Sequence, residues 1–116
     1  MKEFKMEDVV QKQLEAYNQR NLAKFCDCYH SEIECMRLIS NTITCRGIDE
    51  FRKIYENLFK DSPALHCELK SRIILLDSVI DEEFVTGVEK YPHGLHTVAI
   101  YGFREGLIDK VWFARK

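Results

Sequence analysis

The fold is decided at residues 47–63, which run GIDEFRKIYENLFKDSP. Gly47 opens this segment, and Pro63 closes it because proline cannot continue a helix. Between them the large apolar side chains recur at helical spacing and form one stripe, which consists of Ile48, Phe51, Ile54, Tyr55, Leu58 and Phe59. The segment therefore predicts an amphipathic helix that stops at Asp61-Ser62-Pro63.

Two further helices and two short strands are predicted upstream of this segment. Residues 4–18 carry another helical stripe, made of Met6, Val9, Val10, Gln13, Leu14 and Tyr17. Asn21 can cap a short second helix by accepting a hydrogen bond from an early backbone N–H, and one face of that helix collects Leu22, Phe25, Cys26 and Tyr29. Between residues 33 and 45 the period shortens around Ser40-Asn41, which predicts the two strands.

The half of the chain after residue 63 predicts a sheet. Residues 65–116 have no helical period, and turn signals recur at Asp77-Ser78, Pro92-His93-Gly94 and Glu105-Gly106. We therefore expect four long antiparallel strands. Because a sheet must bury one face against another layer, the sequence predicts one α+β domain over residues 1–116, with the helices of the N-terminal half packed on the sheet.

The composition excludes several classes of function. The 116 residues carry 17 basic and 19 acidic side chains, for a net charge of -2. Nucleic-acid-binding domains usually carry a basic excess, so we expect no nucleic acid partner. No stretch approaches the roughly 18 apolar residues of a membrane helix, and residues 1–8 are too charged for a secretory signal. We therefore expect a cytoplasmic protein with no membrane partner.

The cysteines predict buried, reduced thiols. Their number is odd and they contain no Cys-x-x-Cys pair: Cys26, Cys28, Cys35, Cys45 and Cys67. The alternative is a metal site built from Cys26, Cys28 and His30, but its spacing matches no known zinc pattern. We expect neither a metal nor a cofactor.

Three stretches carry a resemblance to a known superfamily. They are residues 16–22 (AYNQRNL), Gly47-Ile48 and residues 101–113 (YGFREGLIDKVWF). Together with the order of the elements, they resemble the nuclear transport factor 2-like superfamily, and within it the SnoaL-like and ketosteroid isomerase-like branch. This resemblance implies a cone-shaped, curved antiparallel sheet whose concave face is covered by three helices around a pocket. Members bind or transform small apolar molecules or serve as dimerisation modules, so the fold alone does not decide the function.

The resemblance also implies that steroid isomerase chemistry is absent. That reaction needs a carboxylate that moves a proton, and a tyrosine plus a protonated acid that stabilise the enolate oxygen. Aligned with the isomerases, the tyrosine position falls on Gln13, the carboxylate position on Arg37 and the protonated acid position on Ala99. Arginine cannot act as a base at neutral pH, and alanine has no proton to donate. The chain is therefore expected to resemble steroid delta-isomerase in its fold while lacking the catalytic acids.

Eight residues form the expected ligand-binding set. Gln13 interrupts an apolar stripe, and it either lines the pocket, where its amide finds partners, or lies partly exposed at the helix edge. Arg37 shares strand parity with Ile33 and Cys35, so it either enters the pocket and favours an acid or carbonyl-bearing ligand, or points outward or forms an ion pair. The aromatic members either contact the ligand or pack in the core. The whole set is Gln13, Tyr17, Tyr29, Arg37, Tyr55, Ala99, Tyr101 and Phe113.

The sequence leaves three functions open. The first is a pocket protein that binds a small, partly apolar organic molecule. The second is a proton-transfer isomerase or cyclase that uses Tyr55 with His66 or Asp81, because a carboxylate orients an imidazole and raises its pKa. Against this, Asp81-Glu82-Glu83 also fits a solvated acidic stretch. The third is a dimerisation module whose own side chains fill the cavity.

Strand alternation predicts a homodimer. Thr97, Ala99 and Tyr101 fall on one face of their strand, and Val98 and Ile100 fall on the other. With Trp112 from the last strand, the second face carries an apolar row on the side of the sheet that the helices leave open. Such a row usually marks an interface between subunits.

Overall fold

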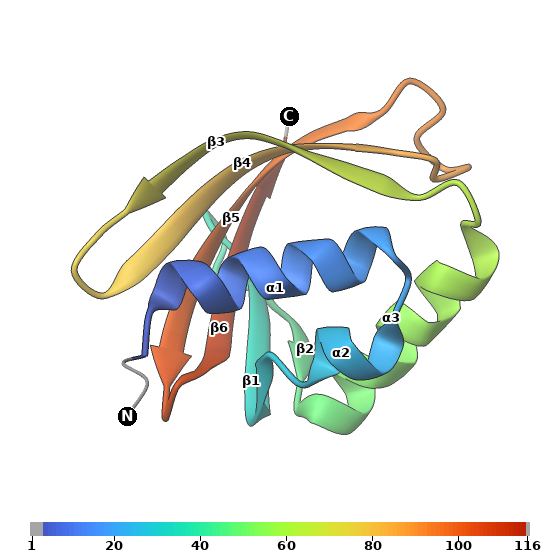
Figure 1. Cartoon of the computed structure of the whole chain (residues 1–116). Helices are drawn as coiled ribbons and strands as arrows, with labels where there is room; N and C mark the ends of the chain where they lie inside the picture. Colours follow the sequence, from blue (N-terminus) through green and yellow to red (C-terminus); the bar gives the residue numbers. More distant parts are fainter. Residues whose placement is uncertain (1–3, 116) are drawn as a thin grey trace.

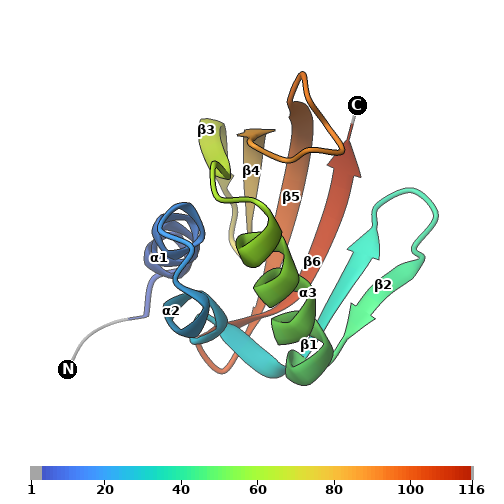
Figure 2. The same ribbon diagram turned by 90° about the vertical axis from the view of Figure 1, so that its right-hand side faces the viewer.

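The computed structural model describes residues 4–115 of the chain. Within this range the helical half comprises α1 (Met6–Asn18), α2 (Leu22–Cys26), β1 (Tyr29–Arg37), β2 (Ile43–Arg46) and α3 (Ile48–Asp61). The second half comprises β3 (His66–Ile74), β4 (Ser78–Thr86), β5 (Leu95–Arg104) and β6 (Leu107–Arg115). The strands form one curved sheet in the order β2-β1-β6-β5-β4-β3. All three helices lie on one side of the sheet, as Figures 1 and 2 show, so the predicted α+β architecture is confirmed.

The local signals of the sequence account for the helices. Asn21 accepts a hydrogen bond from the backbone N–H of Lys24 at 3.1 Å, as the cap prediction requires. The third helix runs from Ile48 to Asp61, directly between the predicted start and stop signals. Tyr29, however, is not on the second helix as expected, because that helix ends at Cys26 and Tyr29 begins β1. Its ring still packs on Phe25, with centroids 5.0 Å apart. The spacing of the apolar residues therefore reflects packing in the same core, although Tyr29 and Phe25 lie on different elements.

The sheet is antiparallel except at one pair. Strands β1 and β6 run parallel, with Arg37 opposite Phe113, whereas β3, β4, β5 and β6 form the predicted meander. The register shifts at several points, including Leu69/Ser71 on β3 and Gly102/Phe103 on β5. Such irregularities bend strands and increase their twist, which helps the sheet to curl around the helices.

Polar contacts fix the end of α1 to the first strand of the meander. The Asn18 side chain donates to the Cys67 carbonyl at 3.0 Å and accepts from the Cys67 N–H at 2.7 Å. Arg20 adds a hydrogen bond to the Leu65 carbonyl at 2.9 Å. These contacts hold α1 against β3 and so set the spacing between helix and sheet.

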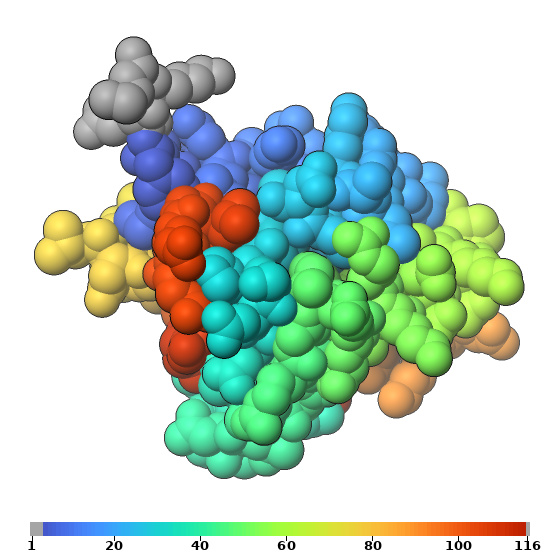
Figure 3. Space-filling model, turned by 90° about the horizontal axis from the view of Figure 1, so that it is seen from below, coloured from blue at the N-terminus to red at the C-terminus, as the bar shows by residue number. Residues whose placement is uncertain are grey.

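An aromatic cluster joins the helices to each other. Phe25 of α2 stacks on Phe51 of α3, with ring centroids 5.5 Å apart and ring planes 9° apart. Tyr55 lies 4.8 Å from Phe25, and Tyr17 lies 5.5 Å from Phe59. Figure 3 shows α2 and α3 side by side on the lower face of the molecule. The cluster forms a rigid wall at this side of the space between the helices and the sheet.

Within residues 4–115 no helix is both long enough and apolar enough to cross a membrane.

Candidate functional site

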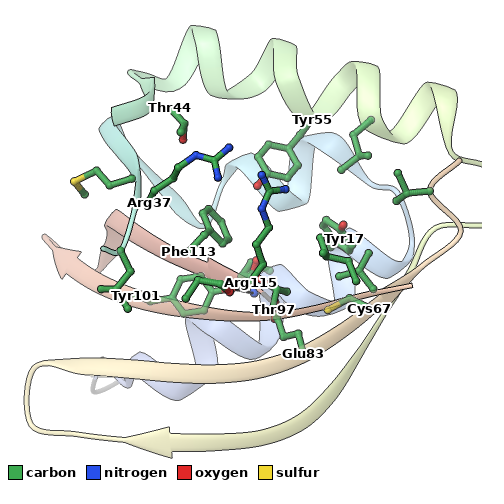
Figure 4. Close-up of a pocket in the computed structure, with 18 of the residues that line it drawn as sticks. Tyr17, Arg37, Thr44, Tyr55, Cys67, Glu83, Thr97, Tyr101, Phe113 and Arg115 are labelled. Carbon is green, nitrogen blue, oxygen red and sulfur yellow. Dashed lines mark hydrogen bonds between the residues drawn. The ribbon is translucent and has the colours of Figure 1, made fainter. Parts of the chain in front are cut away.

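A cavity of about 650 Å³ lies between the helices and the concave face of the sheet. This volume is typical of small-molecule sites. Its inner part contains buried polar side chains, namely Gln13, Glu83, Thr97 and Tyr101. Its mouth lies among exposed residues near the β1–β2 turn and the end of β6, namely Arg37, Ile39, Ser40, Thr44 and Arg115. Figure 4 shows most of the lining side chains, which come from both layers of the fold.

Seven of the eight expected ligand-binding residues line this cavity: Gln13, Tyr17, Tyr29, Arg37, Tyr55, Tyr101 and Phe113. Gln13, Arg37 and Tyr55 therefore share one cavity although they come from α1, β1 and α3. Ala99 does not line it. This residue is fully buried in the sheet, with its Cα opposite Asp81 on β4 and Phe113 on β6.

Gln13 links two tyrosines at the inner end of the cavity. Its Oε1 accepts from the Tyr29 hydroxyl at 2.8 Å, and its Nε2 donates to the Tyr101 hydroxyl at 3.3 Å and to the Val10 carbonyl at 3.0 Å. With only 4% of its surface exposed, Gln13 is not at the helix edge. Burial raises the pKa of both tyrosines well above the ordinary value, so they remain protonated at neutral pH.

Tyr17 and Tyr55 present hydroxyls to the cavity. Within residues 4–115 neither hydroxyl has a hydrogen-bond partner, and Figure 4 shows both rings at the wall of the cavity. Burial raises the pKa of each phenol, so each is a hydrogen-bond donor at neutral pH. These two hydroxyls are therefore free to bind a polar atom of a ligand.

Glu83 is the titratable group that the sequence analysis missed. It points into the cavity from β4 and is only 7% exposed. Burial, together with the negative charge of Asp81, raises its pKa from 4.5 to about 7, although a hydrogen bond with the Cys67 thiol and the charge of Arg72 lower it in part. The signal was available in the parity of β4, since Glu83 has the same parity as the buried Val79 and Asp81. A carboxyl group with this pKa exchanges protons readily near neutral pH.

Asp81 is occupied by an ion pair beside the cavity. Its carboxylate is fully buried and accepts two hydrogen bonds from Arg72, at 2.7 and 3.0 Å. Arg72 also donates to Gln11 Oε1 at 3.0 Å, which ties the pair to α1. Asp81 is therefore the anionic partner of Arg72 and does not line the cavity.

The structure does not bring His66 and Asp81 together. His66 is exposed at the start of β3 opposite Thr86, whereas Asp81 lies opposite Arg72. The six steps along the chain from His66 to Arg72 span roughly 20 Å of strand. His66 does not line the cavity either. The expected acid–base pair does not form, because the register of the β3–β4 hairpin places His66 and Asp81 far apart.

Arg115 is a second lining residue that the sequence analysis missed. It projects from β6 two residues after Phe113, and its Nη1 donates to the Tyr91 hydroxyl at 2.8 Å. Its position beside Arg37 depends on the parallel β1–β6 pairing, which joins distant parts of the chain.

Within residues 4–115 no group of three or more His, Cys, Asp or Glu side chains is placed to hold a metal ion.

The comparisons with known proteins agree with this architecture. Residues 10–111 match the family profile described as a SnoaL-like domain. The chain belongs to the SnoaL-like domain family. This family is part of the nuclear transport factor 2-like superfamily, as the resemblance implied. No curated protein matches the SnoaL-like chain.

Solved structures share the fold of this SnoaL-like domain at low sequence identity. An uncharacterised cystatin-fold protein from Novosphingobium aromaticivorans has a TM-score of 0.83 and 18% identity, over 93% of this chain and 96% of its own. An NTF2-like protein of unknown function from Cytophaga hutchinsonii has a TM-score of 0.80 and 10% identity, over 99% and 93%. A Sinorhizobium meliloti protein, provisionally named a polyketide cyclase, has a TM-score of 0.78 and 10% identity, over 92% and 94%. At these identities the comparisons support the fold alone.

Proposed function

We propose that this SnoaL-like domain binds a small, partly apolar organic molecule in the cavity between its helices and its sheet. The observation that carries the proposal is the cavity itself, whose aromatic and aliphatic walls surround a few polar groups. This combination is the usual construction of a small-molecule site. Tyr17 and Tyr55 supply free hydroxyl donors, while Gln13 and Tyr101 are held in place by their mutual hydrogen bond.

A neutral fluorescent probe tests this proposal. N-phenylnaphthylamine brightens when it leaves water, and we expect saturable binding to the purified protein. The variant Val88→Trp adds a large ring to the cavity wall and should weaken the binding, whereas Leu76→Trp, in the exposed β3–β4 turn, should leave it unchanged. Absence of saturable fluorescence, or equal binding by both variants, would contradict the proposal.

The second candidate is proton transfer, and Glu83 favours it. In its carboxylate form Glu83 takes a proton from a carbon next to a ligand carbonyl, and the resulting carboxyl group returns that proton to another carbon. A tyrosine hydroxyl donates a hydrogen bond to the oxygen on which charge develops. Tyr17 suits this role because it lies at the same end of the cavity as Glu83, as Figure 4 shows. We assign the proton to Glu83 in place of His66 or Asp81, and Tyr55 remains a second candidate donor.

Hydrogen–deuterium exchange tests this candidate without a known substrate. In heavy water, β-tetralone exchanges the hydrogens next to its carbonyl, and nuclear magnetic resonance follows their loss. We expect the protein to accelerate this exchange and Glu83→Gln to abolish the acceleration, since the amide cannot accept the proton. If the wild-type protein gives no acceleration, pure binding is the better description.

We also propose that a second copy of the chain covers the outer face of the sheet. Ile80, Ile100 and Trp112 lie opposite one another on β4, β5 and β6, and Ile73 extends their row onto β3 with 53% of its surface exposed. A row of this kind is costly to leave in water. Light scattering should therefore give twice the chain mass of 13.7 kDa, and a value of 13.7 kDa at micromolar concentration would contradict the dimer.

The cytoplasm is the compartment that we propose. All five cysteines are free, and Cys35 and Cys45 lie directly opposite one another on β1 and β2. An oxidising compartment favours a disulfide between such neighbours, whereas the cytoplasm keeps thiols reduced. Thiol titration of the unfolded protein, isolated with trapping of free thiols, should give five reactive groups. Three would contradict the proposed compartment.

A further inference from the structure

Two arginines converge on the mouth of the cavity. Arg37 lies opposite Phe113 across the parallel β1–β6 pair, and Arg115 follows Phe113 by two residues on the same face of β6. Strand spacing alone places the two Cα atoms roughly 8 Å apart. Figure 4 shows both guanidinium groups directed into the cavity. Each group is therefore positioned to contact a molecule that enters.

In the described part of the chain, no acidic side chain neutralises these two charges. Among residues 4–115 neither Arg37 nor Arg115 has a carboxylate within ion-pair distance, in contrast to Arg72 and Arg104. The nearest cavity acid, Glu83, is separated from Arg115 by the whole of β5, through the row Glu83, Thr97 and Arg115. The mouth of the cavity is therefore positively charged.

Arg115 is held in place without using up its donors. Its Nη1 donates to the Tyr91 hydroxyl, and the guanidinium lies over the Tyr91 ring, 6.0 Å from the centroid. An arginine has five N–H donors, so four remain for a ligand. Because the guanidinium is already oriented, less conformational freedom is lost when an anion binds.

The geometry points to a ligand that is an apolar monocarboxylic acid, with its carboxylate on Arg37 and Arg115 and its apolar body between the helices and the sheet. This inference rests on the proposed binding function and adds the ligand class and its orientation. The walls beyond the mouth are mainly apolar and include Leu58, Val85, Val88, Leu95 and Phe113. At the inner end the Glu83 carboxyl disfavours a second negative charge, so the carboxylate of the ligand faces outward.

Competition with the neutral probe tests the inference. Naphthoate and its methyl ester have the same aromatic body and differ in charge, and each is measured by displacement of N-phenylnaphthylamine. We expect the wild-type protein to bind naphthoate at least about tenfold more tightly than the ester, since charge-assisted hydrogen bonds to arginine contribute on this scale. Added salt should weaken naphthoate binding and leave the ester unchanged.

Three variants complete the experiment. Arg37→Gln and Arg115→Gln should each reduce naphthoate affinity several-fold and so reduce the preference for naphthoate over its ester. Arg46→Gln is the matched control, because Arg46 is an exposed arginine on β2 that pairs with Glu34 and does not line the cavity. Equal affinity of the wild-type protein for acid and ester, with the probe still bound, would overturn the inference alone. Failure of the probe to bind would overturn the proposed function and the inference together.

Discussion

Asp81 and Glu83 project from the same face of β4, two residues apart, and Arg72 forms an ion pair with Asp81 alone. The first carboxyl group is fully buried beside the cavity, and the second lines it. Two acids on one strand face therefore have different roles. Asp81 is held in an ion pair by Arg72, and Glu83 carries a proton that it can release near neutral pH.

The raised pKa of Glu83 predicts a pH-dependent stability. Its pKa is about 7 in the folded protein against an ordinary value of 4.5, so the folded state holds its proton more tightly than the unfolded state. The contribution of this proton to the free energy of unfolding is fully present below pH 4.5 and is lost as the pH rises through 7. The total loss is up to about 3 kcal/mol. Urea unfolding at pH 5 and pH 8 should show this loss. Glu83→Gln should remove most of it and should be the more stable protein at pH 8; an unchanged pH dependence would contradict the assignment.

Breaking the ion pair should destabilise the fold. Arg72→Met leaves the fully buried Asp81 without its partner, and an uncompensated buried charge costs about 3–5 kcal/mol. Urea unfolding measures the loss. The double variant Arg72→Met with Asp81→Leu should recover a large part of it, because the orphaned charge is gone. If the double variant is no more stable than the single one, the charge is not the cause.

Two glycines with similar φ angles should respond differently to alanine. Gly87 and Gly47 have φ values of +84° and +87°, where an L residue is strained. At Gly87 a Cβ would also collide with the Ala64 carbonyl, whereas at Gly47 it meets open space. Gly47→Ala should cost about 1–3 kcal/mol of unfolding free energy and Gly87→Ala clearly more. Equal losses in urea unfolding would mean that the backbone near Ala64 yields to the new methyl group.

The protein should not isomerise a β,γ-unsaturated ketosteroid at a measurable rate. Arg37, at the position that the resemblance assigns to the isomerase base, stands at the mouth of the cavity, and Ala99 is buried in the sheet. Loss of a general base costs about 10²–10⁴ in rate and loss of an oxyanion donor about 10²–10³. Ultraviolet absorbance of the conjugated product measures the reaction. Robust turnover by the unmodified protein would contradict the alignment of Gln13, Arg37 and Ala99 with the isomerase positions.

The sequence predicted what depends on local pattern. The third helix, the Asn21 cap and the alternation of Thr97, Ala99 and Tyr101 follow from spacing within one element. Gln13 and Arg37 belong to the expected ligand-binding set because Gln13 interrupts an apolar helical stripe and Arg37 shares strand parity with Ile33 and Cys35.

The sequence could not predict what depends on pairing between distant segments. Arg115 approaches Arg37 only because β6 pairs in parallel with β1, and the distance between His66 and Asp81 follows from the register of β3 with β4. The pKa of Glu83 results from burial by elements on both sides of the cavity. No local pattern contains that information, although the parity of β4 indicates which of its acids face inward.

An amide chemical-shift titration with N-phenylnaphthylamine tests the central claim most directly, because it locates the bound probe. The account predicts that the largest shifts occur at cavity residues from both layers, including Tyr17, Tyr55 and Phe113, and that the outer-face residues Ile100 and Trp112 are unaffected. Saturable shifts confined to the outer face, or none at all, would contradict it.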